Sequence, residues 1–116
     1  MLIDDRLEFL KLMNLFLSRN YEVEIAENGL QAISKLHSGY MPDIIVSDLN
    51  MPFVDGRSFV SQVKVSLKFR NIPIIILSSN DKSEDRIDLL KLGVSDYIVK
   101  PFNPEELELR IQKLTA

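Results

Sequence analysis

Short apolar runs alternate with longer segments of helical periodicity along the whole chain. The runs at 44–46 and 74–77 are unbroken, which is typical of central strands that are covered by helices on both faces. Residues 21–25 instead alternate polar and apolar side chains, so we expect this strand to have one wetter face and to lie near an edge of its sheet. The predicted strands are 1–3, 21–25, 44–47, 74–77 and 97–99.

The segments between these runs carry the start and stop signals of α-helices, and the predicted helices are 6–18, 29–38, 57–68, 83–92 and 104–114. Three of them open with a capping residue followed three positions later by an acid or amide: Asn28 with Gln31, Asp81 with Glu84, and Asn103 with Glu106. Pro104 suits a first helical position, and Gly39 and Gly93 suit left-handed helix ends. Four residues at helical spacing predict the core-facing side of the first helix: Phe9, Leu12, Met13 and Phe16.

Five strand-then-helix units in this order predict an α/β fold, in which a parallel sheet carries helices on both faces. The 116 residues suit one domain, 1–116. The net charge of −3 argues against a nucleic-acid surface, and the absence of cysteine excludes disulfides and thiolate metal sites. No apolar run is long enough to cross a bilayer, and no signal peptide fits the N-terminus, so we expect a cytoplasmic protein without a membrane contact.

Polar or charged side chains directly follow four of the five predicted strands. These residues are Asp4 and Asp5, Asp48, Ser78, and Lys100. Because ligands bind beyond the carboxyl ends of the strands in such sheets, we expect the side chains to share one site. Neighbouring carboxylates repel one another, and a hard divalent cation with oxygen ligands, for which magnesium is the natural candidate, relieves that repulsion. Lys100 supplies a point charge that suits a phosphate oxygen.

In this order and at this spacing, these motifs resemble the receiver domain of two-component response regulators. The likeness covers almost the whole chain and rests on the acidic pair at 4–5, on residues 48–52 with Asp55 and Gly56, and on Ser78, Tyr97 and 100–102. It implies a flavodoxin-like (βα)5 fold, a doubly wound five-stranded parallel sheet with the strand order 2-1-3-4-5.

The resemblance also implies a role for each matching residue. Asp48 would be the phosphoacceptor, a carboxylate that takes a phosphoryl group from a phosphohistidine. Mg²⁺ would be held by Asp4, Asp5, Asp48 and the backbone carbonyl of Asn50. Ser78 and Lys100 would hold the phosphoryl oxygens, Ser78 and Tyr97 would switch the face formed by the fourth helix, fifth strand and fifth helix, and the Lys100–Pro101 bond would be cis.

The implied partners are a sensor histidine kinase or phosphotransfer protein and a downstream output domain or protein, with homodimerisation on phosphorylation as a further possibility. The domain itself would not bind nucleic acid and would not be a dedicated enzyme, beyond slow autodephosphorylation. A phosphorylation-independent adaptor is the alternative function. An aspartyl phosphatase fits less well, because Asn50 stands where that chemistry commonly needs a second carboxylate.

Two features depart from the family pattern. The position after the acidic pair is usually acidic, whereas this chain has Arg6 there, close to the expected metal and phosphate. The sequence leaves open whether Arg6 shifts the magnesium affinity or reaches the phosphate. Only three residues precede Asp4, so the first strand is expected to be short.

Overall fold

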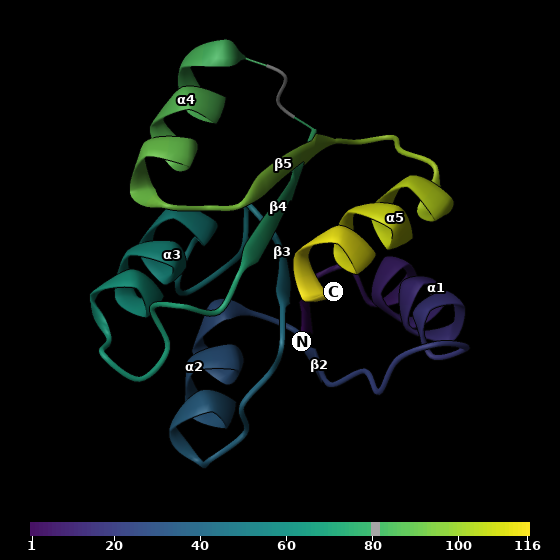
Figure 1. Cartoon of the computed structure of the whole chain (residues 1–116), viewed down its shortest axis with the longest axis horizontal. Coiled ribbons are helices and arrows are strands. Elements are labelled where there is room, and N and C mark those ends of the chain that lie inside the picture. The colour runs from purple at the N-terminus through teal and green to yellow at the C-terminus, as the bar shows by residue number, and fades with distance from the viewer. Residues whose placement is uncertain (80–81) are drawn as a thin grey trace.

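A five-stranded parallel sheet lies between two layers of helices in this computed structural model, which describes residues 1–79 and 82–116 (Figure 1). The strands of the described residues are β1 (Leu2–Ile3), β2 (Ile25–Ala26), β3 (Ile45–Asp48), β4 (Ile74–Ser78) and β5 (Asp96–Val99). The helices are α1 (Leu7–Leu17), α2 (Gly29–His37), α3 (Gly56–Val65), α4 (Ser83–Leu92) and α5 (Pro104–Thr115). The strand order is β2-β1-β3-β4-β5, which confirms the predicted doubly wound fold.

The alternation of side chains along each strand divides the core into two clusters. Ile3, Ile45 and Ile76 face α2, α3 and α4, whereas Leu2 and Ile75 belong to the cluster under α1 and α5. Figure 1 shows these two groups of helices on opposite sides of the sheet. Because both faces of β3 and β4 are covered, their sequences are continuous apolar runs.

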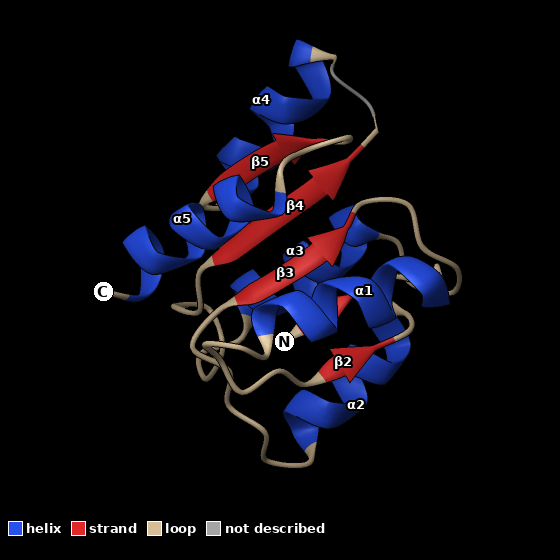
Figure 2. Cartoon of the chain, turned by 90° about the vertical axis from the view of Figure 1, so that its right-hand side faces the viewer, coloured by secondary structure: helices blue, strands red, loops and turns tan. Residues whose placement is uncertain are grey.

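The strands all run in one direction, so their carboxyl ends meet at one edge of the sheet (Figure 2). This edge carries Asp48 as the last residue of β3 and Ser78 as the last residue of β4. Asp4 follows β1, and Lys100 follows β5. The fold therefore brings together residues from both ends of the sequence.

Two predicted elements are shorter in the structure. The expected strand at 21–25 is reduced to Ile25–Ala26, because its neighbour β1 offers only Leu2 and Ile3 as pairing partners. The expected helix at 57–68 ends at Val65. The Ser66 hydroxyl there accepts a hydrogen bond from the Phe69 N–H at 3.2 Å, and Phe69 turns back into the core. The remaining elements agree with their predicted bounds to within one residue or so.

The predicted core face of α1 was wrong at Leu12, whose side chain is 65% exposed. The buried stripe of this helix instead runs through Leu10, Met13 and Leu17, which are three and four residues apart. Phe9 and Phe16 are half-buried at its margin. Helical spacing alone allowed both stripes, and only the position of α1 against the sheet selects between them.

The helix ends largely follow their predicted chemistry. Asn28 caps α2 by accepting a hydrogen bond from the Gln31 N–H at 2.8 Å, and Asn103 caps α5 by accepting from the Glu105 N–H at 2.9 Å. Pro104 is the first residue of α5. Gly39 and Gly93 both have positive φ angles, of 109° and 110°. The predicted cap at Asp81 lies outside the described residues. No helix in the described ranges is both long and apolar enough to cross a membrane.

Gly56 begins α3 directly beneath the end of β3, and its backbone approach leaves no space for a side chain. A Cβ atom there would lie 2.8 Å from the Leu49 Cα and carbonyl oxygen and 2.9 Å from the Asp48 carbonyl oxygen. The Gly56 N–H also donates to the Leu49 carbonyl oxygen at 2.7 Å. The atoms in the way are backbone atoms, so rotation of a side chain cannot relieve the contact.

We expect Gly56→Ala to lower the free energy of unfolding by about 2 kcal/mol, because the added methyl group forces the two backbone segments apart. Urea unfolding of the purified protein measures the change. Gly39→Ala is the matched control, since a Cβ at Gly39 meets nothing within 4 Å. Any loss of stability in that variant comes from the positive φ of residue 39 and not from a steric contact. A Gly56→Ala protein as stable as the parent would contradict the steric argument.

Candidate active site

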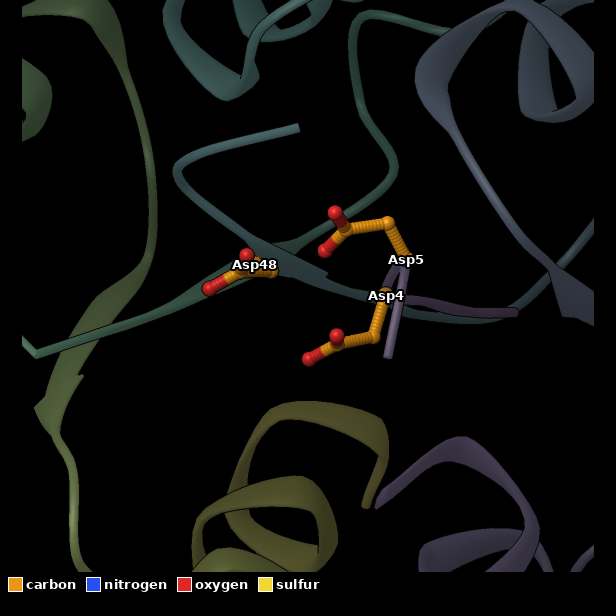
Figure 3. A group of neighbouring side chains, drawn as sticks. All are labelled: Asp4, Asp5 and Asp48. Atoms are coloured by element: carbon orange, nitrogen blue, oxygen red, sulfur yellow. The ribbon is translucent and has the colours of Figure 1, made fainter. Parts of the chain in front are cut away.

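Three carboxylates converge at the carboxyl edge of the sheet (Figure 3). Asp4 and Asp5 follow β1, and Asp48 ends the neighbouring strand β3. One oxygen from each of the three lies within 4.8 Å of the others. Asp4 is fully buried and Asp48 is 8% exposed, whereas Asp5 is exposed to solvent. The site therefore has a buried floor formed by two carboxylates and a solvent-facing rim formed by the third.

Lys100 joins two of these carboxylates. Its ammonium donates to the Asp4 Oδ2 and to the Asp48 Oδ1, at 3.1 Å in each case. The Lys100 N–H also donates to the Ser78 carbonyl oxygen at 2.7 Å, which fixes the residue at the end of β4. Its side chain is only 10% exposed. The predicted proximity of Lys100 to the acidic residues is thus observed, across 96 and 52 positions of sequence.

Burial raises the pKa of Asp48 above its ordinary value. The negative charge of Asp4 raises it further, while Lys100, and more weakly Arg6, favours the ionised form and offsets part of the effect. Ionisation of Asp48 therefore remains costly in this site even with the Lys100 ammonium beside it.

The site residues fit a divalent cation. Carboxylate oxygens are the ligands that Mg²⁺ prefers, and this ion binds through few protein ligands while keeping several water molecules. The exposed position of Asp5 leaves room for such water beside the buried pair. Asn50, whose backbone carbonyl is the fourth predicted ligand, is exposed in the loop that follows β3.

Two other predicted residues lie on the strands beside this group. Ser78 is fully buried at the end of β4, in register with Val99 of β5. Tyr97 lies on β5 and is 8% exposed, with the guanidinium carbon of Arg86 5.5 Å from its ring centroid. The Lys100–Pro101 peptide bond is cis, as predicted. The structure thus holds Ser78 and Tyr97 on adjacent strands, and their movement as a switch stays a prediction.

Phe9 is a site neighbour that the sequence did not indicate. Its ring centroid lies 4.5 Å from the Lys100 ammonium and 4.9 Å from the guanidinium carbon of Arg6, and Phe102 packs against it edge to face at 6.1 Å. Attraction between these cations and the ring helps to hold both side chains beside the carboxylates of the site. In the sequence, the signal that could have indicated this contact is the spacing of Arg6 and Phe9, which stand three positions apart at the start of a helix and therefore on one face of it.

A cavity of about 550 Å³ lies away from the acidic site. Its lining includes Met1, Glu24 and Ile44 at the amino ends of the strands, and it contains none of the predicted site residues. The acidic site is instead open to solvent at Asp5. An open site of this kind suits a small transferred group delivered by another molecule rather than an enclosed organic ligand.

Comparison with known proteins gives a consistent picture. The family model described as "Response regulator receiver domain" matches residues 1–112. The chain is 37% identical over 116 residues to the transcriptional regulatory protein ResD of Bacillus subtilis, covering 98% of this chain and 46% of that protein. It is 34% identical to the chemotaxis protein CheY1 of Helicobacter pylori, covering 97% of this chain and 92% of that protein.

Among solved structures, the chain superimposes on the receiver domain of the sensor histidine kinase PA1611 from Pseudomonas aeruginosa with a TM-score of 0.82 and 29% identity. The match covers 98% of this chain and 93% of that one, and that structure has a magnesium ion coordinated in its active site cleft. The chain spans about half or less of most of the curated relatives that it matches, from 7% of one hybrid histidine kinase to 51% of one response regulator.

Proposed function

This chain belongs to the response regulator receiver domain family of two-component systems, and we propose that it works as a phosphoacceptor whose site of phosphorylation is Asp48. The observation that carries the proposal is the convergence of Asp4, Asp5 and Asp48 around one point, with the Lys100 ammonium 3.1 Å from two of them. Phosphoryl transfer to a carboxylate requires a positioned nucleophile and positive charge that neutralises the transferring group. Asp48 would supply the nucleophile, and Lys100 together with a cation held by the three carboxylates would supply the positive charge.

In the proposed reaction an Asp48 carboxylate oxygen attacks the phosphorus of a phosphohistidine on a partner protein. The new P–O bond forms as the P–N bond breaks, and the released imidazole takes up a proton. Asp4, Asp5, Asp48 and the Asn50 carbonyl would hold Mg²⁺, which would neutralise negative charge on the transferring group.

The remaining residues would hold the product. Lys100 already reaches Asp48 Oδ1, so a short movement would place its ammonium on a phosphoryl oxygen bound there. The Ser78 hydroxyl, at the end of the adjacent strand β4, would donate to another oxygen. Tyr97 lies on the next strand, so a movement of Ser78 would be transmitted to the surface formed by α4, β5 and α5.

The partners follow from this chemistry. The upstream partner would be a sensor histidine kinase or a phosphotransfer protein, and the downstream partner an output domain or protein that reads the α4–β5–α5 surface. Phosphorylation would also promote homodimerisation there. The domain would act in the cytoplasm as a switch rather than as a dedicated enzyme, with slow autodephosphorylation as its hydrolytic activity.

The function is tested by incubating the chain with acetyl phosphate and following its intact mass. We expect an increase of one phosphoryl group in the presence of Mg²⁺, no increase when EDTA removes the metal, and a modified peptide that contains Asp48. Circular dichroism of the same samples checks that the protein is folded. A folded protein that takes up no phosphoryl group under these conditions would favour the phosphorylation-independent adaptor.

A further inference from the structure

The preferences of residues at helix ends do not explain why an arginine stands at position 6. It is the N-cap residue of α1, where Ser, Thr, Asp and Asn are preferred, and its side chain makes no capping hydrogen bond. A positive charge at this end of a helix is also unfavourable, because the helix dipole is positive there. Stability of α1 therefore does not account for an arginine at this position, and its contacts with the site are the alternative explanation.

Those contacts place Arg6 against the buried carboxylate of the site. Its side-chain Nε lies 3.6 Å from the Asp4 Oδ1, and its backbone N–H donates to the same oxygen at 2.9 Å. The ring of Phe9, whose centroid is 4.9 Å from the guanidinium carbon, supports the side chain from within α1. Since the Lys100 ammonium donates to the Asp4 Oδ2, both oxygens of this fully buried carboxylate lie close to a cation.

The charge balance of the site depends on this arginine. Three carboxylates face two cations within this group, Lys100 and Arg6, so the formal charge of the group is −1 when all five side chains are counted as ionised. Without Arg6 the same formal count gives −2. A divalent cation that binds the three carboxylates must approach against the field of both cations, and Arg6 is 56% exposed at the rim where the ion would enter.

We propose that Arg6 sets the affinity of this site for divalent cations, by neutralising Asp4 and thereby making Mg²⁺ binding weaker than the three carboxylates alone would give. The inference rests on the proposed function, since it concerns the same metal site. It assigns to Arg6 a positioning and electrostatic role through Asp4. The arginine does not itself contact the metal ion in this proposal.

Removal of one positive charge beside a divalent-cation site is expected to tighten binding by about tenfold at low ionic strength. The side chain is largely exposed, so added salt screens its charge and the effect should shrink as the KCl concentration rises. Arg6→Met removes the charge while keeping a flexible apolar side chain over Phe9. Arg6→Lys keeps the charge and should bind Mg²⁺ with nearly the parent affinity.

The chain offers a matched control in Arg19, at the other end of the α1 region. Its guanidinium carbon lies 4.1 Å from the ring centroid of Phe16, so it makes the same kind of contact away from the acidic site. Arg19→Met changes the net charge of the protein by the same amount as Arg6→Met. Comparison of the two separates the local field of Arg6 from the effect of total charge.

Isothermal titration calorimetry with MgCl₂ measures the dissociation constants of the parent and of the three variants, and thermal melting confirms that each is folded. The inference holds if Arg6→Met binds Mg²⁺ about tenfold more tightly, while Arg6→Lys and Arg19→Met stay close to the parent. It is overturned if a folded Arg6→Met binds no more tightly than Arg19→Met.

The calorimetry also separates this inference from the proposed function. If the parent takes up a phosphoryl group with Mg²⁺ and Arg6→Met has an unchanged dissociation constant, the role of Arg6 is wrong and the function stands. If neither protein binds Mg²⁺, both are overturned. If Arg6→Met binds the ion and the parent neither binds it nor takes up phosphate, the role of Arg6 is supported and the function fails.

Discussion

Replacing Asp48 with asparagine should abolish phosphoryl uptake from acetyl phosphate. The amide has no ionised oxygen to attack phosphorus, and the site loses one of its three carboxylate ligands. Intact-mass measurement in the presence of Mg²⁺ should therefore show no increase under conditions that modify the parent. Phosphorylation at the parent level in Asp48→Asn would contradict the assignment of the phosphoacceptor.

The same substitution should stabilise the metal-free protein by about 1 kcal/mol, because an ionised carboxylate buried in this site is replaced by a neutral group. Lys100 keeps Asp4 as a partner in the variant, so no cation is left alone. The pKa of Asp48 is raised in the folded state, so its ionisation costs stability at a pH above that pKa. The cost is relieved as the pH falls through the raised pKa, and the difference between variant and parent should narrow toward acid pH.

Asp55→Asn provides the control for both measurements. Asp55 is exposed and caps α3 by accepting from the Ser58 N–H at 2.8 Å, a role in which Asn and Asp are about equally good. This variant should take up a phosphoryl group and unfold at nearly the parent urea concentration. Loss of activity together with a gain of stability in Asp48→Asn alone would exclude misfolding as the cause. An Asp48→Asn protein less stable than the parent would contradict the charge argument.

Replacing Lys100 with methionine should change phosphoryl uptake and metal binding in opposite directions. Loss of the ammonium removes the cation that would hold a phosphoryl oxygen, so the rate of uptake should fall by about a hundredfold. In the parent protein the same ammonium binds two of the three carboxylates and repels a second cation. Mg²⁺ should therefore bind more tightly in the variant. Intact-mass time courses give the rate, and calorimetry with MgCl₂ gives the affinity.

Lys100→Met should also destabilise the metal-free protein by about 3 kcal/mol, because it takes a buried partner from the fully buried Asp4. Saturating Mg²⁺ should restore much of that loss, since a ligand that binds only the folded state stabilises it. Lys113→Met, an equal change of charge at an exposed position of α5, should leave all three measurements close to the parent values. Equal uptake rates in Lys100→Met and the parent would contradict the proposed role.

The fold class was predictable because its signals are local and repeated. Apolar runs with strand propensity, amphipathic segments and capping residues such as Asn28 and Asn103 each depend on a few neighbouring residues, and the structure confirms them. The order of the strands came from the resemblance to a family rather than from these signals. The expected edge strand at 21–25 shows where local signals fail, since a strand also needs a partner of matching length.

The candidate site was predictable in part for a related reason. Parallel strands deliver the residues that follow them to one edge, so Asp4, Asp48 and Lys100 were expected together, and the observed distances of 3.1 Å confirm their proximity. The partners of individual side chains were not predictable. Phe9 was assigned to the core of α1, but its ring also contacts Lys100 and Arg6 beside the carboxylates of the site.

The sequence by itself determined the type and order along the chain of the strands and helices and which side chains reach the carboxyl edge of the sheet, because hydrophobic periodicity and end signals act over a few residues. The lengths of the strand predicted at 21–25 and of the helix predicted at 57–68 were decided by tertiary contacts. The tertiary structure alone decided that Leu12 faces solvent, that Gly56 must lack a side chain, and that Arg6 lies against Asp4. These outcomes depend on how closely separate elements approach one another. Such distances are set by the packing of the whole domain, which no short stretch of sequence encodes.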